Sequence, residues 1–119
     1  MNAGKTSWII PDGYISSTSG SQVSHDAVCV LNIGDQDASI TLTLYFEDAE
    51  PMAFYAKCNA RRTHHIRMDK ITDPSGNPVP RDTPYAILVN SSCPIVVQYS
   101  RLDTTASDTA LMTTIAYPL

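Results

Sequence analysis

The densest run of side chains that could do chemistry is residues 61–68, which read Arg-Arg-Thr-His-His-Ile-Arg-Met. If this run is a strand, Ile66 and Met68 mark an inward face that Arg62 shares, while three hydrogen-bond donors line the outward face: Thr63, His65 and Arg67. Hydroxyl, imidazole and guanidinium groups in a row suit a carboxylate, a phosphate or a hydroxyl-rich ligand. A solvated or subunit-contact face is the simpler interpretation, and we favour it.

A second set of polar residues directly follows the apolar run at 94–97. It contains Gln98, Arg101 and Asp103. Arg101 and Asp103 share one face of an extended chain, so we expect them to pair and either hold the guanidinium for a ligand or close the strand. Gln98 falls on the other face, where we expect it to be partly buried and to need hydrogen-bond partners. A structural network explains this group as well as a ligand site does.

Two further patterns resemble catalytic or metal sites but have the wrong geometry. Ser24, His25 and Asp26 are the residue types of a hydrolytic triad, yet on a strand His25 faces away from the other two. His64 and His65 also face opposite ways, and no metal-ligand spacing accompanies them. We therefore expect no enzyme, no metal and no cofactor, and we keep His25 and Asp26 as binding or network residues.

Two aromatic residues near the start of the chain offer a different contact. Trp8 and Tyr14 could provide a stacking face for a sugar ring, because aromatic faces accept polarised C–H groups. They could equally anchor the core. For Trp8, the only tryptophan, the core is the favoured interpretation.

The composition narrows the function classes. The chain has 119 residues, 43% of them apolar and 17% charged, which predicts one folded domain over residues 1–119 and excludes a disordered chain. Its net charge is −4 with eight Lys and Arg residues, so general nucleic-acid binding is disfavoured. Three cysteines, no secretory leader pattern and no apolar run long enough to span a bilayer predict a cytoplasmic protein with reduced thiols.

Strands, not helices, must position these residues. Residues 38–47 alternate apolar and polar over their whole length, which predicts a strand with one face on a core. Similar segments lie at 7–10, 27–33, 52–58, 63–68, 85–90, 95–102 and 111–117, with turn residues between them at 16–21, 91–94 and elsewhere. Eight short strands predict an all-β sandwich or barrel with little helix, at most one turn within 103–110. We expect 27–33 and 38–47 to form a hairpin or to lie near one another.

Taken together, several of these segments resemble one known family. They are residues 8–15, 24–35, 45–51, 60–63, 65–67, 82–83, 92–98, 101–103 and 114–117. They cover nearly the whole chain in the same order, and they resemble the Anabaena sensory rhodopsin transducer family. The chain departs from the family pattern at Asp26, where we expect the longer Glu, and at His64, where a Lys is commoner.

The resemblance implies a single antiparallel β-sandwich, jelly-roll-like, that assembles as a fourfold ring and is cytoplasmic and non-enzymatic. The family's founding member is the partner of a membrane photoreceptor, and its wider relatives look like domains that bind sugars or related metabolites. The polar positions that carry over are His25, Asp26, Asn32, Glu50, Arg61, Arg62, Thr63, His65, Arg67, Gln98, Arg101 and Asp103.

The leading hypothesis is a non-catalytic homotetramer that binds a small polar, sugar-like metabolite. Its candidate binding residues are Trp8, Tyr14, His25, Asp26, Arg62, Thr63, His65, Arg67, Gln98, Arg101 and Asp103. One alternative is a signalling adaptor that docks on the cytoplasmic face of a membrane receptor, to which an acidic chain would suit a basic partner segment. Another is a DNA-binding regulator whose ring repeats the arginines at 61, 62 and 67.

Overall fold

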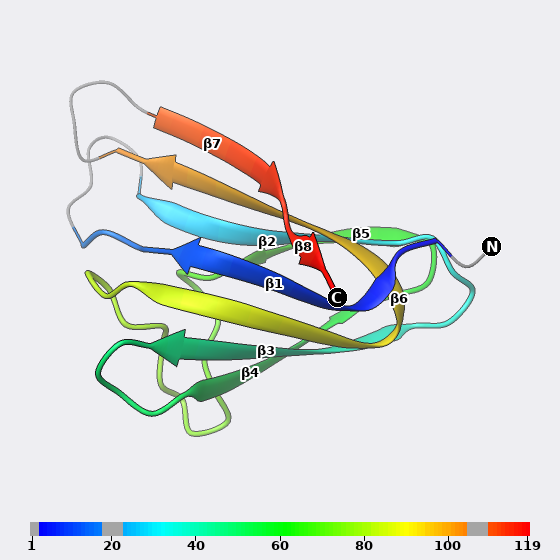
Figure 1. The fold of residues 1–119 in the computed structure, drawn as a ribbon, viewed down its shortest axis with the longest axis horizontal. Coiled ribbons are helices and arrows are strands. Elements are labelled where there is room, and N and C mark those ends of the chain that lie inside the picture. Colours follow the sequence, from blue (N-terminus) through cyan, green and yellow to red (C-terminus); the bar gives the residue numbers. More distant parts are fainter. Residues whose placement is uncertain (1–2, 18–22, 105–109) are drawn as a thin grey trace.

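Strands account for every regular element in the computed structural model, which describes residues 3–17, 23–104 and 110–119 (Figure 1). They are β1 (Lys5–Gly13), β2 (His25–Asn32), β3 (Ala38–Phe46), β4 (Met52–Cys58), β5 (Arg62–Arg67), β6 (Tyr85–Asp103), β7 (Ala110–Ile115) and β8 (Tyr117–Pro118). All strand pairs are antiparallel. The prediction of an all-β, antiparallel fold of about eight strands is confirmed.

Two sheets share the long strand β6. Residues 85–95 of β6 pair with β1 and β3 in a first sheet, whose order is β4-β3-β6-β1-β8. Residues 96–103 pair with β2 and β7 in a second sheet, whose order is β5-β2-β6-β7. Figure 1 shows β6 running in one direction in yellow, bending, and returning in orange. The strand thereby joins the two layers of the sandwich.

The bend in β6 replaces a predicted turn. We expected residues 85–90 and 95–102 to be separate strands, but 91–94 continue the strand between them. Ser92 Oγ accepts the backbone N–H of Ser39 at 2.9 Å, so a side chain supplies a bond where the ladder is distorted. Gly4 packs directly against the backbone of Ile95 at the bend. Its φ is 98°, and a Cβ there would lie 2.2 Å from the carbonyl oxygen of Ile95, so the position requires glycine. The polar and Pro residues that suggested a turn thus mark a bend.

The core between the sheets follows the alternating pattern. In β3, the inward residues are no more than 2% exposed: Ala38, Ile40, Leu42 and Leu44. They pack in one cluster with Phe54 of β4 and with Val28, Val30 and Val97 of the second sheet. Burying each such side chain contributes about 1.5–3 kcal/mol. This packing fixes which face of each strand is left for polar residues.

Residues 27–33 and 38–47 do not form the predicted hairpin, although both segments pair with β6 and pack in the same core. β2 pairs with β5 and β6 in the second sheet, whereas β3 pairs with β4 and β6 in the first. Asn32 holds the crossing segment, because its buried Nδ2 donates to the carbonyl oxygens of Gln36 at 2.8 Å and Cys58 at 3.0 Å. Its Oδ1 accepts the N–H of Gly34 at 3.0 Å. The turn residues that follow β2 therefore lead from one sheet to the other instead of closing a hairpin.

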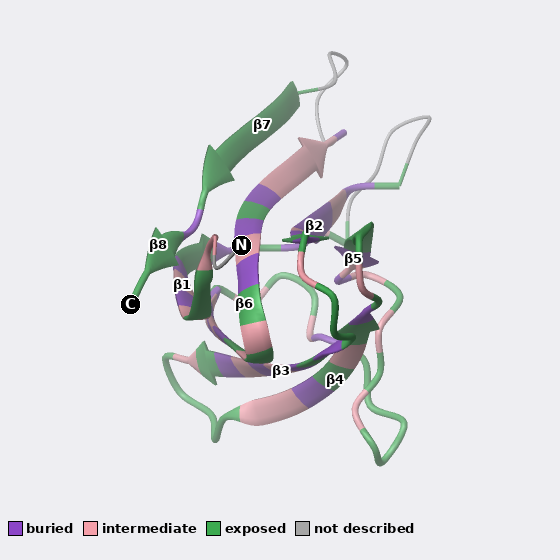
Figure 2. Cartoon of the chain, turned by 90° about the vertical axis from the view of Figure 1, so that its right-hand side faces the viewer, coloured by how far each residue is buried: buried purple, intermediate pink, exposed green. Residues whose placement is uncertain are grey.

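The last predicted strand, residues 111–117, is divided between the sheets. β7 pairs with β6 in the second sheet, and β8 pairs with Trp8 and Ile9 of β1 in the first. Between them, buried Ala116 donates its N–H to the Val97 carbonyl at 3.0 Å. Figure 2 shows β7 at the margin of the sandwich, exposed along its whole length.

Some expectations fall outside the described residues. They are most of the turn at 16–21 and most of the possible helical turn at 103–110. Within the described ranges, the structure holds no helix long and apolar enough to cross a membrane.

Candidate functional site

A buried carboxylate, Asp26, organises one end of the sandwich. It has no exposed surface, and its Oδ2 accepts hydrogen bonds from the Tyr85 hydroxyl at 2.7 Å, the Tyr14 N–H at 3.0 Å and the Tyr99 hydroxyl. Its Oδ1 lies 3.2 Å from Nε of Arg101. Arg101 also donates to the Tyr99 hydroxyl at 2.9 Å. We call these five residues the Asp26 cluster.

The cluster is assembled by strand pairing. Asp26 of β2 lies directly opposite Arg101 of β6, and Tyr85 and Tyr99 come from the two halves of that strand. Burial and the adjacent negative charge of Asp26 raise the pKa of both tyrosines well above its usual value. Both phenols are therefore protonated donors at neutral pH, and Asp26 is fully occupied by its own chain. The cluster holds the guanidinium of Arg101 in place.

Four predicted site residues, Tyr14, His25, Arg101 and Asp103, line a hollow beside this cluster. A small hollow of about 30 Å³ there is lined by Tyr14, Ser16, Ser24, His25, Arg101, Leu102 and Asp103. It has room for water but not for a sugar ring. Arg101 pairs with Asp26 in place of the predicted Asp103, because Asp26 lies directly across the ladder. The structure thus brings Tyr14, His25, Asp26, Arg101 and Asp103 together, as a mainly structural group.

The predicted outward row exists on the second sheet, and two of its three donors, Thr63 and Arg67, already have partners in the chain. Thr63 Oγ1 donates to the carbonyl of Val30 at 3.1 Å, and Arg67 forms two 2.8 Å bonds to Asp69. Burial alone would raise the pKa of Asp69, but the hydrogen bonds and charge of Arg67 hold it below its usual value. His65 lies directly opposite Cys29, which in turn lies opposite Gln98.

Gln98 is exposed, not partly buried as predicted, because this face of the sheet is uncovered, and its Nε2 donates to Thr113 Oγ1. Arg62 is also exposed, and its guanidinium donates to the carbonyl of Arg61 at 3.0 Å. Trp8, by contrast, is buried, and its Nε1 donates to the carbonyls of Lys5 and Ile95 at 3.0 and 3.2 Å. These positions do not meet the Asp26 cluster in one pocket. In the part of the chain that the structure describes, no three His, Cys, Asp or Glu residues gather as a metal site.

A polar pocket of about 510 Å³ opens at the opposite end of the sandwich. It is lined by Ala3, Ile33, Gly34, Asp35, Gln36, Arg61, Cys93 and Pro94. The crossing segment after β2, the turn between β4 and β5, and the bend of β6 meet here (Figure 1). The pocket combines donors, acceptors and two apolar surfaces, and its volume falls within the range that holds small ligands.

The polar pocket contains an unusual backbone conformation. Arg61 has a φ of 58°, which a residue with a side chain rarely adopts. Asp37 stabilises this turn by accepting the N–H of Ala60 at 2.8 Å, and Asp35 accepts the Arg61 guanidinium at 2.6 Å. Strained backbone of this kind is concentrated at functional sites. The strain presents the Arg61 side chain to the pocket.

Sequence reasoning named Arg61 as a polar position but did not place it in a site with Asp35, Gln36 and Cys93. Around Asp35 the sequence predicts only the connection between two strands, and at Cys93 only a reduced thiol. The sequence signal for this site is the acid Asp35 and the amide Gln36, which directly follow Gly34. Nothing local indicated that Arg61 and Cys93 would reach it.

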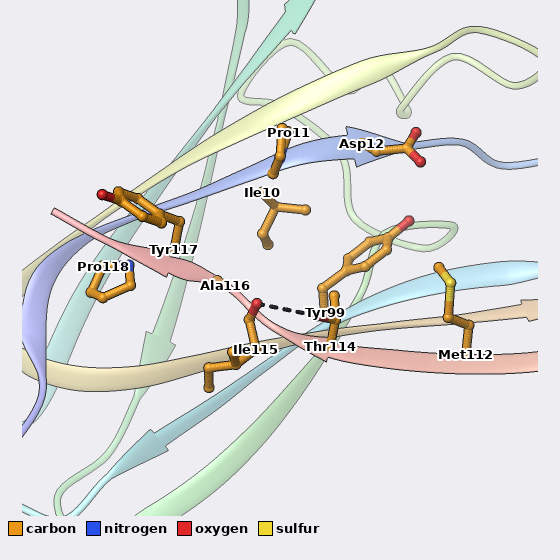
Figure 3. A pocket seen from close by; sticks show the side chains of 10 residues that line it. All are labelled: Ile10, Pro11, Asp12, Tyr99, Met112, Thr114, Ile115, Ala116, Tyr117 and Pro118. Carbon is orange, nitrogen blue, oxygen red and sulfur yellow. Dashed lines mark hydrogen bonds between the residues drawn. The ribbon is translucent and has the colours of Figure 1, made fainter.

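A third region, the apolar pocket, lies beside the Asp26 cluster and encloses about 400 Å³. Figure 3 shows its lining: Ile10, Pro11, Asp12, Tyr99, Met112, Thr114, Ile115, Ala116, Tyr117 and Pro118. Asp12 and the ring of Tyr99 lie toward the end where Met112 projects, and Tyr117 and Pro118 lie at the other end. Asp12 is the only charged residue among these ten, and its Oδ1 is 3.8 Å from Arg101.

Comparison with known proteins places this geometry in a family. The family model described as the Anabaena sensory rhodopsin transducer matches residues 3–118. The solved structure of Thermotoga maritima 1070 has 36% identity and a TM-score of 0.89, over 98% of this chain and 97% of that one. The Anabaena sensory rhodopsin transducer has 40% identity and a TM-score of 0.73, over 83% and 84%. No protein with a curated description matches. The chain therefore belongs to the Anabaena sensory rhodopsin transducer family.

Proposed function

We propose that this chain is a cytoplasmic, non-catalytic sensory domain that binds a small, neutral, sugar-like metabolite in the polar pocket. Membership of the transducer family supports a sensory, non-enzymatic role. The observation that carries the ligand proposal is the exposed Asp35–Arg61 pair, presented by a strained backbone beside Gln36 in a pocket of about 510 Å³. This site replaces the Asp26 end as the main candidate.

The charges of the polar pocket favour a neutral polyol over an ion. Its lining carries one carboxylate, Asp35, and one guanidinium, Arg61, so their formal charges cancel. Asp35 accepts, Arg61 donates, and the Gln36 amide does both, which matches the mixed donor and acceptor character of sugar hydroxyls. Ile33 and Pro94 offer apolar surface for the ring carbons. A sugar acid or phosphate would meet repulsion from Asp35.

A thermal-shift screen against sugars, polyols and sugar acids tests this proposal, because a ligand that binds only the folded state raises Tm. We expect neutral sugars to give the largest shifts. The Arg61→Ala variant should lose the shift, while the matched control Arg62→Ala, which changes the adjacent arginine outside the pocket lining, should keep it. A screen in which no sugar or polyol raises Tm contradicts the proposal.

We propose that the outward face of the second sheet serves a different purpose, the contact between subunits of a tetramer. This face carries the exposed side chains of Leu31 and Ile115 beside His65 and Gln98. Exposed apolar side chains grouped with polar ones are typical of a protein interface. The family resemblance supports a ring of four.

Light scattering tests the assembly directly. We expect a mass of four times 13.0 kDa, and we expect Leu31→Asp to lower it. The matched control is Tyr55→Asp, which changes an exposed residue of β4 in the other sheet. A monomeric wild-type chain contradicts the tetramer, and a Leu31→Asp tetramer moves the contact to another face.

The DNA-binding alternative has less support from the charges. Arg61 lies 2.6 Å from Asp35 and Arg67 lies 2.8 Å from Asp69. Two of the three arginines that would contact phosphates are thus already paired with carboxylates, which reduces the positive potential that DNA binding needs.

A further inference from the structure

The strand β7 has a free edge. One side of it pairs with β6, and no described strand pairs with the other side. All six of its residues are exposed, with Leu111 at 74% and Ile115 at 61%. Natural proteins usually protect such edges with Lys, Pro or bulges, because an open edge pairs readily with other chains. The sequence of β7, Ala-Leu-Met-Thr-Thr-Ile, contains neither a charge nor a proline.

The phase of the hydrogen bonds shows which backbone groups this edge presents. Ala116 donates its N–H to the Val97 carbonyl, and bonded pairs alternate along an antiparallel ladder. Thr114 and Met112 therefore bond to β6. The amide and carbonyl groups of Leu111, Thr113 and Ile115 point to the free edge. Of these groups, the Ile115 carbonyl accepts the Thr114 hydroxyl at 3.4 Å, and the others have no backbone partner among the described strands.

The side chains of an added strand would reach the apolar pocket. Met112 and Thr114 line this pocket, so they mark the inward face of β7. In a sheet, neighbouring residues on paired strands point to the same face, so residues opposite Met112 and Thr114 would point inward too. Two other strands lie beside the pocket, β1 and β8. β1 has Pro11 there and cannot donate from that residue, and β8 is only two residues long and contains Pro118. Of the three strands, β7 therefore offers the longest edge to an added strand.

The charge around the pocket specifies what the added segment should carry. Asp12 is 79% exposed at 3.8 Å from Arg101, while Arg101 already serves the buried Asp26 at 3.2 Å. Two carboxylates thus share one guanidinium. Glu47 lines the hollow that adjoins Asp12 and adds a further carboxylate. A cationic side chain fits this end of the pocket.

We propose that the free edge of β7 takes up an extended segment of a partner protein as an added strand, with a large apolar side chain in the apolar pocket and a Lys or Arg against Asp12. This mode combines backbone bonds for affinity with a pocket and a charge for specificity. A second copy of this chain fits less well, since its own β7 has no cation to bring to Asp12. The inference does not depend on the metabolite site.

A labelled peptide of sequence Thr-Lys-Thr-Phe-Thr-Lys-Thr is the probe, since its Phe and Lys residues share one face of a strand. Fluorescence anisotropy with the full chain should show saturable binding. A peptide with Glu in place of Lys, and a fully N-methylated peptide that cannot pair, should both bind at least tenfold more weakly. Equal binding of all three peptides, or no binding at millimolar concentration, overturns the proposal.

Variants of the chain locate the binding. Asp12→Asn should weaken binding of the Lys peptide a few-fold. The matched control is Glu50→Gln, which changes an exposed carboxylate outside the lining of the apolar pocket and of the hollow beside Asp12, and it should leave binding unchanged. Met112→Lys, which places a cation in the pocket, should abolish binding while a native melting transition shows that the fold is kept. Equal effects of Asp12→Asn and Glu50→Gln overturn the placement, as does unchanged binding by Met112→Lys.

Discussion

The two ends of the sandwich each hold an aspartate–arginine pair, and the pairs differ in what surrounds them. Asp26 and Arg101 are 0% and 21% exposed, and two tyrosine hydroxyls and a backbone N–H complete the bonds of the carboxylate. Asp35 and Arg61 are 81% and 73% exposed and line an open pocket. The same two residue types thus serve the fold at one end and remain available to a ligand at the other.

A third pair lies between these extremes. Arg67 and Asp69 are 34% and 4% exposed, so the carboxylate is covered while the guanidinium reaches water. The three pairs form a series in which the energetic cost of losing a partner should follow burial, because a charge left in the core cannot be hydrated. Substitutions at the three pairs test that series.

The largest effect is expected at the buried pair. Asp26→Ala leaves the Arg101 guanidinium and the Tyr85 and Tyr99 hydroxyls without their acceptor, and should lower the free energy of unfolding by about 3–5 kcal/mol. Asp35→Ala, the matched change at the exposed pair, should cost less than about 1 kcal/mol. Urea unfolding measures both. Equal losses would mean that burial does not distinguish the two ends.

The tyrosines of the Asp26 cluster should make the fold sensitive to alkali. Their pKa is raised in the folded state by burial and by Asp26, so above pH of about 10 the unfolded chain releases protons that the folded chain keeps. Stability should therefore be steady below that pH and fall above it. Tyr99→Phe should cost about 1–3 kcal/mol at neutral pH and flatten the alkaline decline. Unfolding midpoints across the alkaline range measure this, and an unchanged slope in the variant would refute the assignment.

The intermediate pair should respond to acid. Arg67 lowers the pKa of Asp69 in the folded state, so the pair stabilises the fold above the ordinary aspartate value, and this contribution is lost as pH falls through the lower folded value. Arg67→Gln should cost about 1.5–3 kcal/mol at neutral pH, because it leaves the covered carboxylate of Asp69 without its charged partner. The wild type and the variant should converge in unfolding midpoint as pH falls through the lowered folded pKa of Asp69. A constant gap at all pH values argues against the ion pair.

The smallest effect on stability is expected at the exposed pair, with the largest effect on binding. Arg61→Gly replaces a residue at φ 58° with one that adopts this angle without strain, so stability should hold or rise by up to about 1 kcal/mol. The same variant should lose the response to neutral sugars in the thermal-shift assay. A variant that keeps the sugar response places the ligand elsewhere.

Local patterns predicted much of the fold. Strict alternation in residues 38–47 identified β3 and its inward face, and Ile66 and Met68 identified the inward face of β5. These signals are readable because side-chain direction depends only on position along a strand. The bend of β6 was not readable, because residues 91–94 have the composition of a turn. The segment is held extended by pairing on either side of it, of Asn90 and Ser91 with β1 and β3 and of Ile95 with β1.

The sites were less predictable, because both depend on contacts between distant parts of the chain. Arg101 was expected to bind Asp103, two residues away, but its partner is Asp26, separated by 75 residues. The polar pocket joins Asp35, Arg61 and Cys93 from three separate segments. The resemblance to the family supplied the correct fold and named Arg61 and Arg101. It did not indicate that Arg101 is held by a buried carboxylate while Arg61 lines an open pocket.

The strand β6 pairs with β1 and β3 in one sheet and with β2 and β7 in the other. Unfolding of either sheet removes paired strands from β6. The central amide protons of β6 should therefore exchange with solvent only when the whole domain unfolds. The edge strands can therefore fluctuate and bind other molecules while β6, which joins the two layers, keeps its hydrogen bonds. Because β7 pairs with β6, a segment bound at β7 would affect the backbone of β6. The same strand forms one wall of the polar pocket at Cys93 and Pro94.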